Sequence, residues 1–132
     1  MSGGHFDYLQ FRLSEIVESI KDEIYNNNRP PHKEPSNRWE EEINEIWEKN
    51  GCRTWSKETI EEFQKAIYYL RRAEAYATRV DWLLSGDDGE ESFHQRLKHD
   101  IQVIELIEKN EKERENKGLC PYENYINRLN TD

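Results

Sequence analysis

Long hydrophobic runs are missing from this sequence of 132 residues. No 18 consecutive residues are apolar, so no segment is expected to span a membrane. Residues 1–8 lack the basic region and following apolar stretch of a secretory signal, so we expect no signal peptide. Cysteine is scarce, because only Cys52 and Cys120 occur, in no CxxC pattern, which favours reduced thiols. These absences predict a cytoplasmic protein.

Basic residues are outnumbered by acidic ones. Asp and Glu total 28 and Lys and Arg total 19, which gives a formal net charge of −9. Duplex nucleic acids and anionic membranes both attract basic surfaces, so we expect neither as a partner. An excess of acid suits solubility, or attraction to a basic surface on another protein.

Apolar residues are also few. Hydrophobic residues make up 34% of the chain and charged residues 36%, whereas charged residues are about 25% of an ordinary globular protein. A monomer of this composition would have a thin core, and association of helices between copies would bury more apolar surface. The length corresponds to one domain, residues 1–132. We therefore expect a single helical domain that forms a homo-oligomer.

Apolar residues recur at three- and four-residue steps, which is typical of amphipathic helices. No extended strand-like alternation occurs, so the predicted fold class is all-α. Helices are expected over about residues 6–25, 37–50, 56–84, 88–117 and 121–129. Three of the four prolines lie within residues 26–36, which is predicted to be a linker between the first two helices, because proline interrupts helix.

Capping residues mark the expected helix ends. The expected N-terminal caps are Asn37 with Glu40, Ser56, and Asp88 with Glu91. Gly86 is expected at the left-handed position that follows a helix. The third helix, about 28 residues or 42 Å long, is the central one. The tight turn at 85–89 is expected to join it to the fourth helix as an antiparallel hairpin within a helical bundle.

The long helix has two unlike faces when its residues are placed at 100° intervals. The apolar face, which is expected to point into the core, contains Phe63, Ala66, Ile67, Leu70, Ala73, Ala77, Val80 and Leu84. The opposite face, called here the basic aromatic stripe, contains Lys65, Tyr68, Arg71, Arg72, Tyr76, Arg79 and Trp82. An acidic protein thus carries one locally basic surface that is rich in rings.

The side chains of this stripe suit a small phosphorylated nucleotide. A guanidinium group matches the geometry of phosphate oxygens, and Tyr and Trp rings can stack on a base. A small ligand responds mainly to the nearest charges, because screening acts over about 8 Å. Backbone donors of residues 3–5 and 85–89 could complete the pocket. The predicted ligand-binding residues are Tyr68, Arg71, Arg72, Tyr76, Arg79, Trp82 and His5.

An alternative is that the arginines are neutralised inside the protein. The helix at 37–50 presents a row of glutamates, and the fourth helix begins with Glu90 and Glu91. The arginines could pair with these carboxylates while the rings pack beneath another helix. The sequence leaves both interpretations open.

Metal sites have weak support. Gly3-Gly4-His5 suggests a terminal copper site, but removal of Met1 would leave the histidine fourth, where the site requires it third. Glu91-x-x-His94 matches one step of a di-metal bundle, which needs a second such step and two further glutamates. We expect no metal and no cofactor.

Catalysis has equally weak support. The magnesium-dependent all-α nucleotide pyrophosphatases use a Glu-x-x-Glu step followed by Glu-x-x-Asp. The first step occurs at Glu42/Glu45 and Glu58/Glu61, but no Glu-x-x-Asp follows either of them. No nucleophile with a neighbouring base can be placed. We therefore expect a protein that is not an enzyme.

Two stretches resemble a family of small uncharacterised proteins found in bacteriophages and bacterial genomes. They are Ser2-Gly3-Gly4-His5-Phe6-Asp7-Tyr8 and residues 79–93, RVDWLLSGDDGEESF, which Arg96-Leu97 follow. The resemblance implies a phage protein that acts in the bacterial host cytosol. Small phage accessory proteins often inhibit host defence, some by sequestering nucleotide signals between subunits and others by covering nucleic-acid-binding surfaces. The resemblance implies no catalytic residue.

Three functions follow as hypotheses. The first is a non-catalytic anti-defence protein that binds and sequesters a small phosphorylated nucleotide signal through the basic aromatic stripe. The second is an acidic protein–protein inhibitor, or nucleic-acid mimic, that acts on a host defence protein through the glutamates of the second helix and the acidic turn at 85–89. The third is a metal-dependent all-α nucleotide pyrophosphatase.

Overall fold

The computed structural model describes residues 4–27, 32, 34–49 and 55–122. A short 3-10 helix, Leu9–Phe11, precedes the α-helices α1 (Arg12–Tyr25), α2 (Arg38–Lys49), α3 (Lys57–Leu84) and α4 (Glu90–Asn116). No strand occurs in the described ranges, so the prediction of an all-α protein is confirmed. The helix expected over 121–129 falls almost wholly outside the described residues, and the linker at 26–36 is described only in part.

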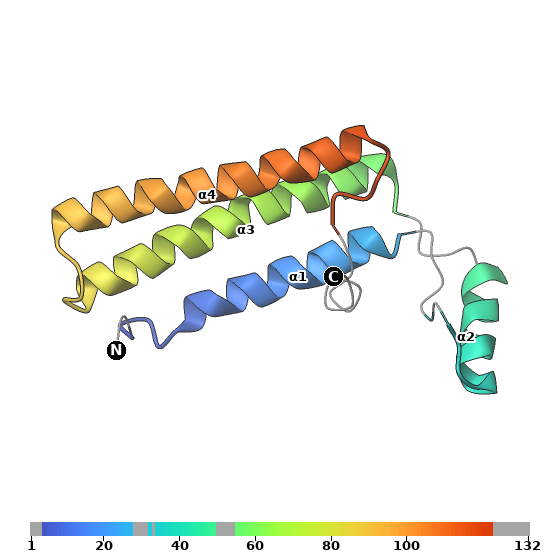
Figure 1. Cartoon of the computed structure of the whole chain (residues 1–132). Helices are drawn as coiled ribbons and strands as arrows, with labels where there is room; N and C mark the ends of the chain where they lie inside the picture. The colour runs from blue at the N-terminus through green and yellow to red at the C-terminus, as the bar shows by residue number, and fades with distance from the viewer. Residues whose placement is uncertain (1–3, 28–31, 33, 50–54, 123–132) are drawn as a thin grey trace.

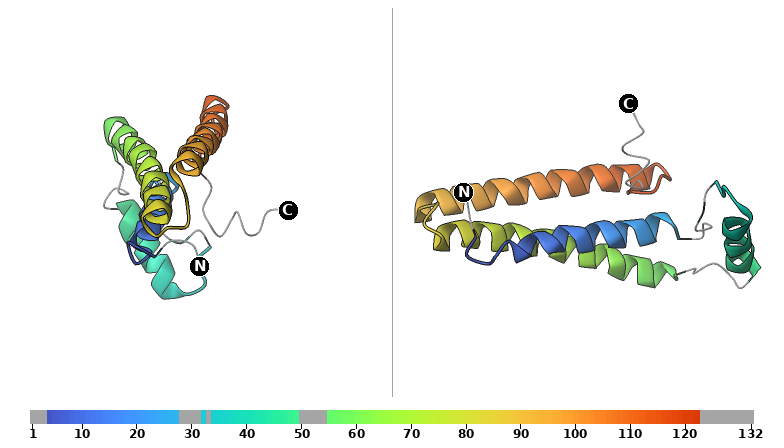
Figure 2. Two further views of the ribbon diagram at one scale, coloured as in Figure 1. Left: turned by 90° about the vertical axis from the view of Figure 1, so that its left-hand side faces the viewer. Right: turned by 90° about the horizontal axis from the view of Figure 1, so that it is seen from below.

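α3 is the central helix of the arrangement (Figure 1). α1 and α4 both pack against it, and α3 and α4 lie side by side in opposite directions. α2 stands apart, at the end where α1 finishes and α3 begins (Figure 2), and makes no extensive contact with another described helix. None of the described helices combines the length and apolar character needed to cross a membrane.

The buried core is small. Its buried hydrophobic residues in the described ranges are Val17, Ile24, Ile67 and Tyr122. They come from α1, α3 and the segment after α4. Phe63 and Leu70 of the predicted apolar face of α3 pack against them, as does Ile60, which the prediction did not include. The thin core expected from the composition is therefore present between α1 and α3.

Side-chain caps begin two of the helices as predicted. The Asn37 side chain accepts a hydrogen bond from the Glu40 N–H at 2.9 Å, and the Ser56 hydroxyl accepts one from the Thr59 N–H at 3.2 Å. Gly86 has φ +79° and follows α3 in the expected left-handed conformation. The prediction for α4 was wrong, because Gly89 is its N-cap residue and Asp88 instead forms an ion pair with Arg96 at 3.4 Å.

The first helix also begins later than predicted. Residues Asp7 and Tyr8 have φ values of +54° and +60°, which are incompatible with a right-handed helix. The 3-10 turn follows them, and α1 starts only at Arg12. The segment before α1 is held to α3 instead, because two of its backbone amides bind a side chain of that helix.

That side chain is Asp81, which is fully buried at 0% exposure. Its carboxylate accepts hydrogen bonds from the Gly4 N–H, the Phe6 N–H and the Gln10 side-chain amide, each at 3.0 Å. Burial acts to raise the pKa of Asp81, but these hydrogen bonds favour the charged form and together hold the pKa below its ordinary value. An ionised carboxylate thus fastens residues 4–10 to the C-terminal part of α3.

This linkage predicts a specific dependence of stability on pH. Because the pKa of Asp81 is lowered by folding, its contribution is complete above the ordinary value of 3.8 and is lost as the pH falls through the folded-state pKa. The difference in Tm between wild type and Asp81→Asn is expected to be constant from neutral pH to about pH 5 and to shrink below 3.8. Thermal melts at stepped pH measure it, and a difference that grows in acid would contradict this assignment.

Candidate functional site

The three arginines of the basic aromatic stripe point at α4. Arg71 donates two hydrogen bonds to the Glu111 carboxylate, at 2.7 and 2.6 Å. The partners of all three arginines are Glu111 for Arg71, Glu108 for Arg72 and Asp100 for Arg79. In each pair both carboxylate oxygens accept a hydrogen bond, and the partner numbers fall along α4 as the arginine numbers rise along α3. The stripe is therefore a seam between two helices.

The carboxylates of α4 also raise the pKa of the three arginines. Hydrogen bonds from Arg72 to Glu108 and from Arg79 to Asp100 raise the pKa of these two guanidinium groups. Burial lowers the pKa of Arg71, but the bond to Glu111 outweighs it and the net shift is upward. A phosphate at these arginines would compete with carboxylates that already accept two charge-assisted hydrogen bonds from each of them. Internal neutralisation, the alternative left open by the sequence, is what these three residues show.

Two of the three predicted stacking rings are covered by guanidinium groups. Arg72 lies 3.5 Å above the ring of Tyr68. Trp82 lies close to two guanidiniums, Arg79 at 4.8 Å and Arg96 at 5.6 Å from the ring centroid. Cation–π contacts of this kind hold the rings in the seam and occupy faces on which a base would stack.

Of the two remaining predicted ligand residues, Tyr76 is an exposed member of the stripe on α3 and His5 lies near the end of that helix. Tyr76 is 52% exposed. His5 lies at the N-terminal segment, where its N–H donates to the Ser85 hydroxyl at 3.2 Å and its ring packs edge-on against Phe6. The turn after α3 therefore does meet the segment around residue 5, as expected, but through a structural hydrogen bond.

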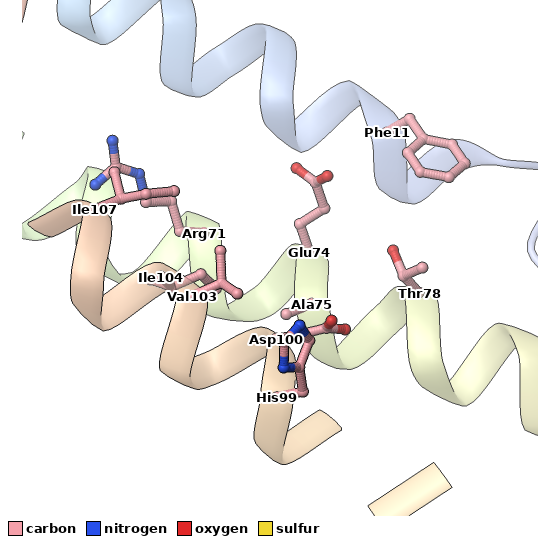
Figure 3. Close-up of a pocket in the computed structure, with 10 residues that line it drawn as sticks. All are labelled: Phe11, Arg71, Glu74, Ala75, Thr78, His99, Asp100, Val103, Ile104 and Ile107. Atoms are coloured by element: carbon pink, nitrogen blue, oxygen red, sulfur yellow. The ribbon is translucent and has the colours of Figure 1, made fainter. Parts of the chain in front are cut away.

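Described residues of α3 line at least two cavities. The larger, of about 370 Å³, lies on α3 between α4 and Phe11, the residue just before α1, and is called here the α1–α4 groove (Figure 3). It is lined by Phe11, Arg71, Glu74, Ala75, Thr78, His99, Asp100, Val103, Ile104 and Ile107. The smaller, of about 230 Å³, is lined by Tyr68, Arg71 and three glutamates, among others. Of the predicted ligand residues only these two line either cavity, so neither cavity gathers the stripe around a nucleotide-sized space.

The part of the chain that the structure describes contains no candidate metal site. Among those residues, no group of three or more His, Cys, Asp and Glu side chains could hold a metal ion. The metal-dependent pyrophosphatase hypothesis therefore gains no support from this part of the chain.

The feature that the sequence did not reveal is the isolation of α2. Its apolar residues, Trp39, Ile43, Ile46 and Trp47, are called here the α2 stripe. None of them is buried, and Trp39 and Ile46 are 67% and 58% exposed. The available signal was the proline-rich linker before α2 and the Asn50-Gly51 step after it, which set this helix off at both ends.

Acidic residues also cluster on α2. It contains five glutamates against Arg38 and Lys49. A backbone hydrogen bond from Ser36, reinforced by its hydroxyl, lowers the pKa of Glu40 and keeps that side chain charged. The helix therefore presents an apolar strip beside a negatively charged face.

Comparison with protein-family models, with curated proteins and with solved structures gave no match for this chain.

Proposed function

We propose that this chain is a non-catalytic binding protein that docks onto a protein partner through α2. The observation that carries the proposal is the exposure of Trp39 and Ile46, at 67% and 58%, on a strongly amphipathic helix that no other described helix packs against extensively. In the setting implied by the resemblance to phage proteins, the partner is a host defence protein and docking inhibits it.

The spacing of the α2 stripe supports a helix-in-groove mode of binding. Trp39, Ile43 and Ile46 are separated by four and three residues and so share one helix face. Partners that bind an amphipathic helix receive such anchors in an apolar groove. A free helix of about 12 residues is only marginally stable in water, so α2 has much to gain from packing against a partner.

The charge of α2 defines the rim of the partner site. The glutamates flank the apolar anchors, so the matching groove carries Lys and Arg at its edges. Charge reversal at the rim acts mainly on the association rate and its salt dependence, whereas loss of a buried aromatic anchor acts on the dissociation rate. Charge-reversal variants therefore test the effect of charge on association, and alanine variants of the apolar residues test their effect on dissociation.

The double variant Trp39→Ala/Ile46→Ala is expected to weaken binding of the partner by about 30-fold, because a central aromatic anchor contributes about 2 kcal/mol or more. Affinity capture from bacterial lysate with quantitative mass spectrometry identifies proteins retained by wild type, and surface plasmon resonance with the purified candidate then measures affinity. The matched control is Tyr69→Ala, which removes an aromatic ring that is 66% exposed on α3. Equal retention by wild type and the α2 variant would rule out docking through this stripe.

Capture of a nucleotide through the basic aromatic stripe is the second candidate, and it ranks lower because Arg71, Arg72 and Arg79 are already paired. A thermal-shift panel of cyclic and ADP-ribose-type nucleotides is expected to leave the Tm of wild type unchanged. A concentration-dependent rise in Tm that is lost in Arg72→Ala or Arg79→Ala would reverse this ranking.

A further inference from the structure

The α1–α4 groove has an apolar wall that the described helices leave exposed. Val103 and Ile107 line the groove and are 42% and 43% exposed. Leu106, which is 59% exposed, does not line the cavity but lies beside them on α4, and the three residues are called here the ridge of α4. Across the groove, Phe11 is 46% exposed and lines the same cavity (Figure 3). Monomeric proteins rarely leave contiguous apolar patches above a few hundred Å² uncovered.

Three of the charged side chains that line the groove, Arg71, Glu74 and Asp100, already have partners. Arg71 is bonded to Glu111, and Asp100 to Arg79. Glu74 accepts a hydrogen bond from the Ser14 hydroxyl of α1. An apolar helix that covered the groove would therefore leave few buried groups without a hydrogen-bond partner. A polar ligand would find few free donors there. The occupant that fits this groove is an apolar helix face.

We propose that a second copy of this chain occupies the groove, with α4 of each copy lying against the α1–α4 groove of the other. The same ridge of α4 that forms the wall of one groove then fills the groove of the partner. Such an interface is isologous and closes after two subunits. Four buried hydrophobic residues in the described ranges make a small core for one copy, and the second copy enlarges it.

The position of the ridge along α4 supports this arrangement. α4 extends from Glu90 to Asn116, and Val103 is its central residue. A two-fold axis near that point brings the ridges of two antiparallel α4 helices together, and the rest of the helix, about 40 Å in total, extends the contact on both sides. That length is sufficient for about 800 Å² per partner, which is the area of a standard stable interface.

Light scattering on purified full-length protein tests the proposal. Wild type is expected at twice the chain mass of 16.0 kDa, and Val103→Glu/Ile107→Glu at 16.0 kDa with helical circular dichroism retained. The milder Val103→Asn is expected to weaken association without complete loss, which covers the case in which the double variant fails to fold. Tyr69→Glu, on an exposed ring of α3, serves as the control and is expected to stay dimeric.

Two results would overturn this inference. One is a wild type that remains at 16.0 kDa up to the highest soluble concentration. The other is a dimer that survives in the groove variants but dissociates in Trp39→Ala/Ile46→Ala, which would show that copies associate through α2. Loss of host-protein binding with the dimer intact concerns only the proposed function, so failure of the two proposals can be distinguished.

Discussion

Replacing Asp81 by alanine is expected to lower the Tm by roughly 10 °C. The substitution removes the acceptor of three hydrogen bonds and leaves the N–H groups of Gly4 and Phe6 without the partner they have in the wild type. It also opens a space beside α3 at a position that is 0% exposed. The expected result is release of residues 4–10 from α3, because apart from these bonds the segment is tied to the end of that helix by the hydrogen bond from the His5 N–H to the Ser85 hydroxyl.

Two measurements check this expectation. Differential scanning calorimetry gives the Tm, and hydrogen exchange at the amides of Gly4 and Phe6 reports whether the segment has detached. Gln10→Ala, which removes one of the three donors, is expected to have a smaller effect. The control is Glu61→Ala at an exposed site on α3, and it is expected to leave the Tm nearly unchanged. Full amide protection in Asp81→Ala would refute the anchoring role.

Replacing Arg71 by methionine is expected to destabilise the protein by about 2 kcal/mol. The Arg71 and Glu111 side chains are only 11% and 17% exposed, so the variant leaves a carboxylate mostly covered and without its cation. Glu108 also lies 3.9 Å from Arg71, which adds to the repulsion between the two glutamates once the guanidinium is gone. Urea denaturation, followed by circular dichroism, measures the free energy of unfolding.

A double-mutant cycle isolates the pair itself. Combining Arg71→Met with Glu111→Gln is expected to recover part of the loss, with a coupling of about 1–3 kcal/mol. The comparison is the pair Arg38–Glu42, whose side chains are 85% and 53% exposed. Arg38→Met is expected to cost less than about 0.5 kcal/mol, because solvent screens such a pair. Equal effects at Arg71 and Arg38 would show that the seam between α3 and α4 is no more than a surface feature.

Much of the fold could be predicted from local sequence, because helix periodicity and capping are local properties. Ser56 and Gly86 fixed the ends of α3 to the residue. The errors at the N-terminus and at Asp88 both involve side-chain contacts that the local rules for helix ends do not include. Asp81 binds the amides of residues 4 and 6, and Arg96 binds Asp88.

The candidate site was harder to predict for a geometric reason. A helical wheel places Arg71, Arg72 and Arg79 on one side of α3, but it does not say which helix covers that side. The position of α4 along α3 determines which carboxylates pair with these arginines. The partners expected from the sequence, at 37–50 and at Glu90 and Glu91, were wrong. The tight 85–89 turn was a usable signal, since it brings acids in the middle and later part of α4 against the arginines of an antiparallel α3.

The isolation of α2 could not be predicted from its own residues. Its stripe has the same three- and four-residue spacing as the helices that do pack, and amphipathicity alone does not specify what covers a helix. Only the arrangement of all four described helices shows that α1 and α4 pack on α3 while α2 is left without them.

The most direct test of the account is site-specific photo-crosslinking in bacterial cells. A benzophenone amino acid is placed either at Trp39 of α2 or at Tyr76, which is exposed in the basic aromatic stripe. The account predicts a covalent adduct with a host protein from position 39 and none from position 76. Adducts with a host protein from position 76 alone would contradict it and would show that the basic aromatic stripe on α3 contacts the host protein instead.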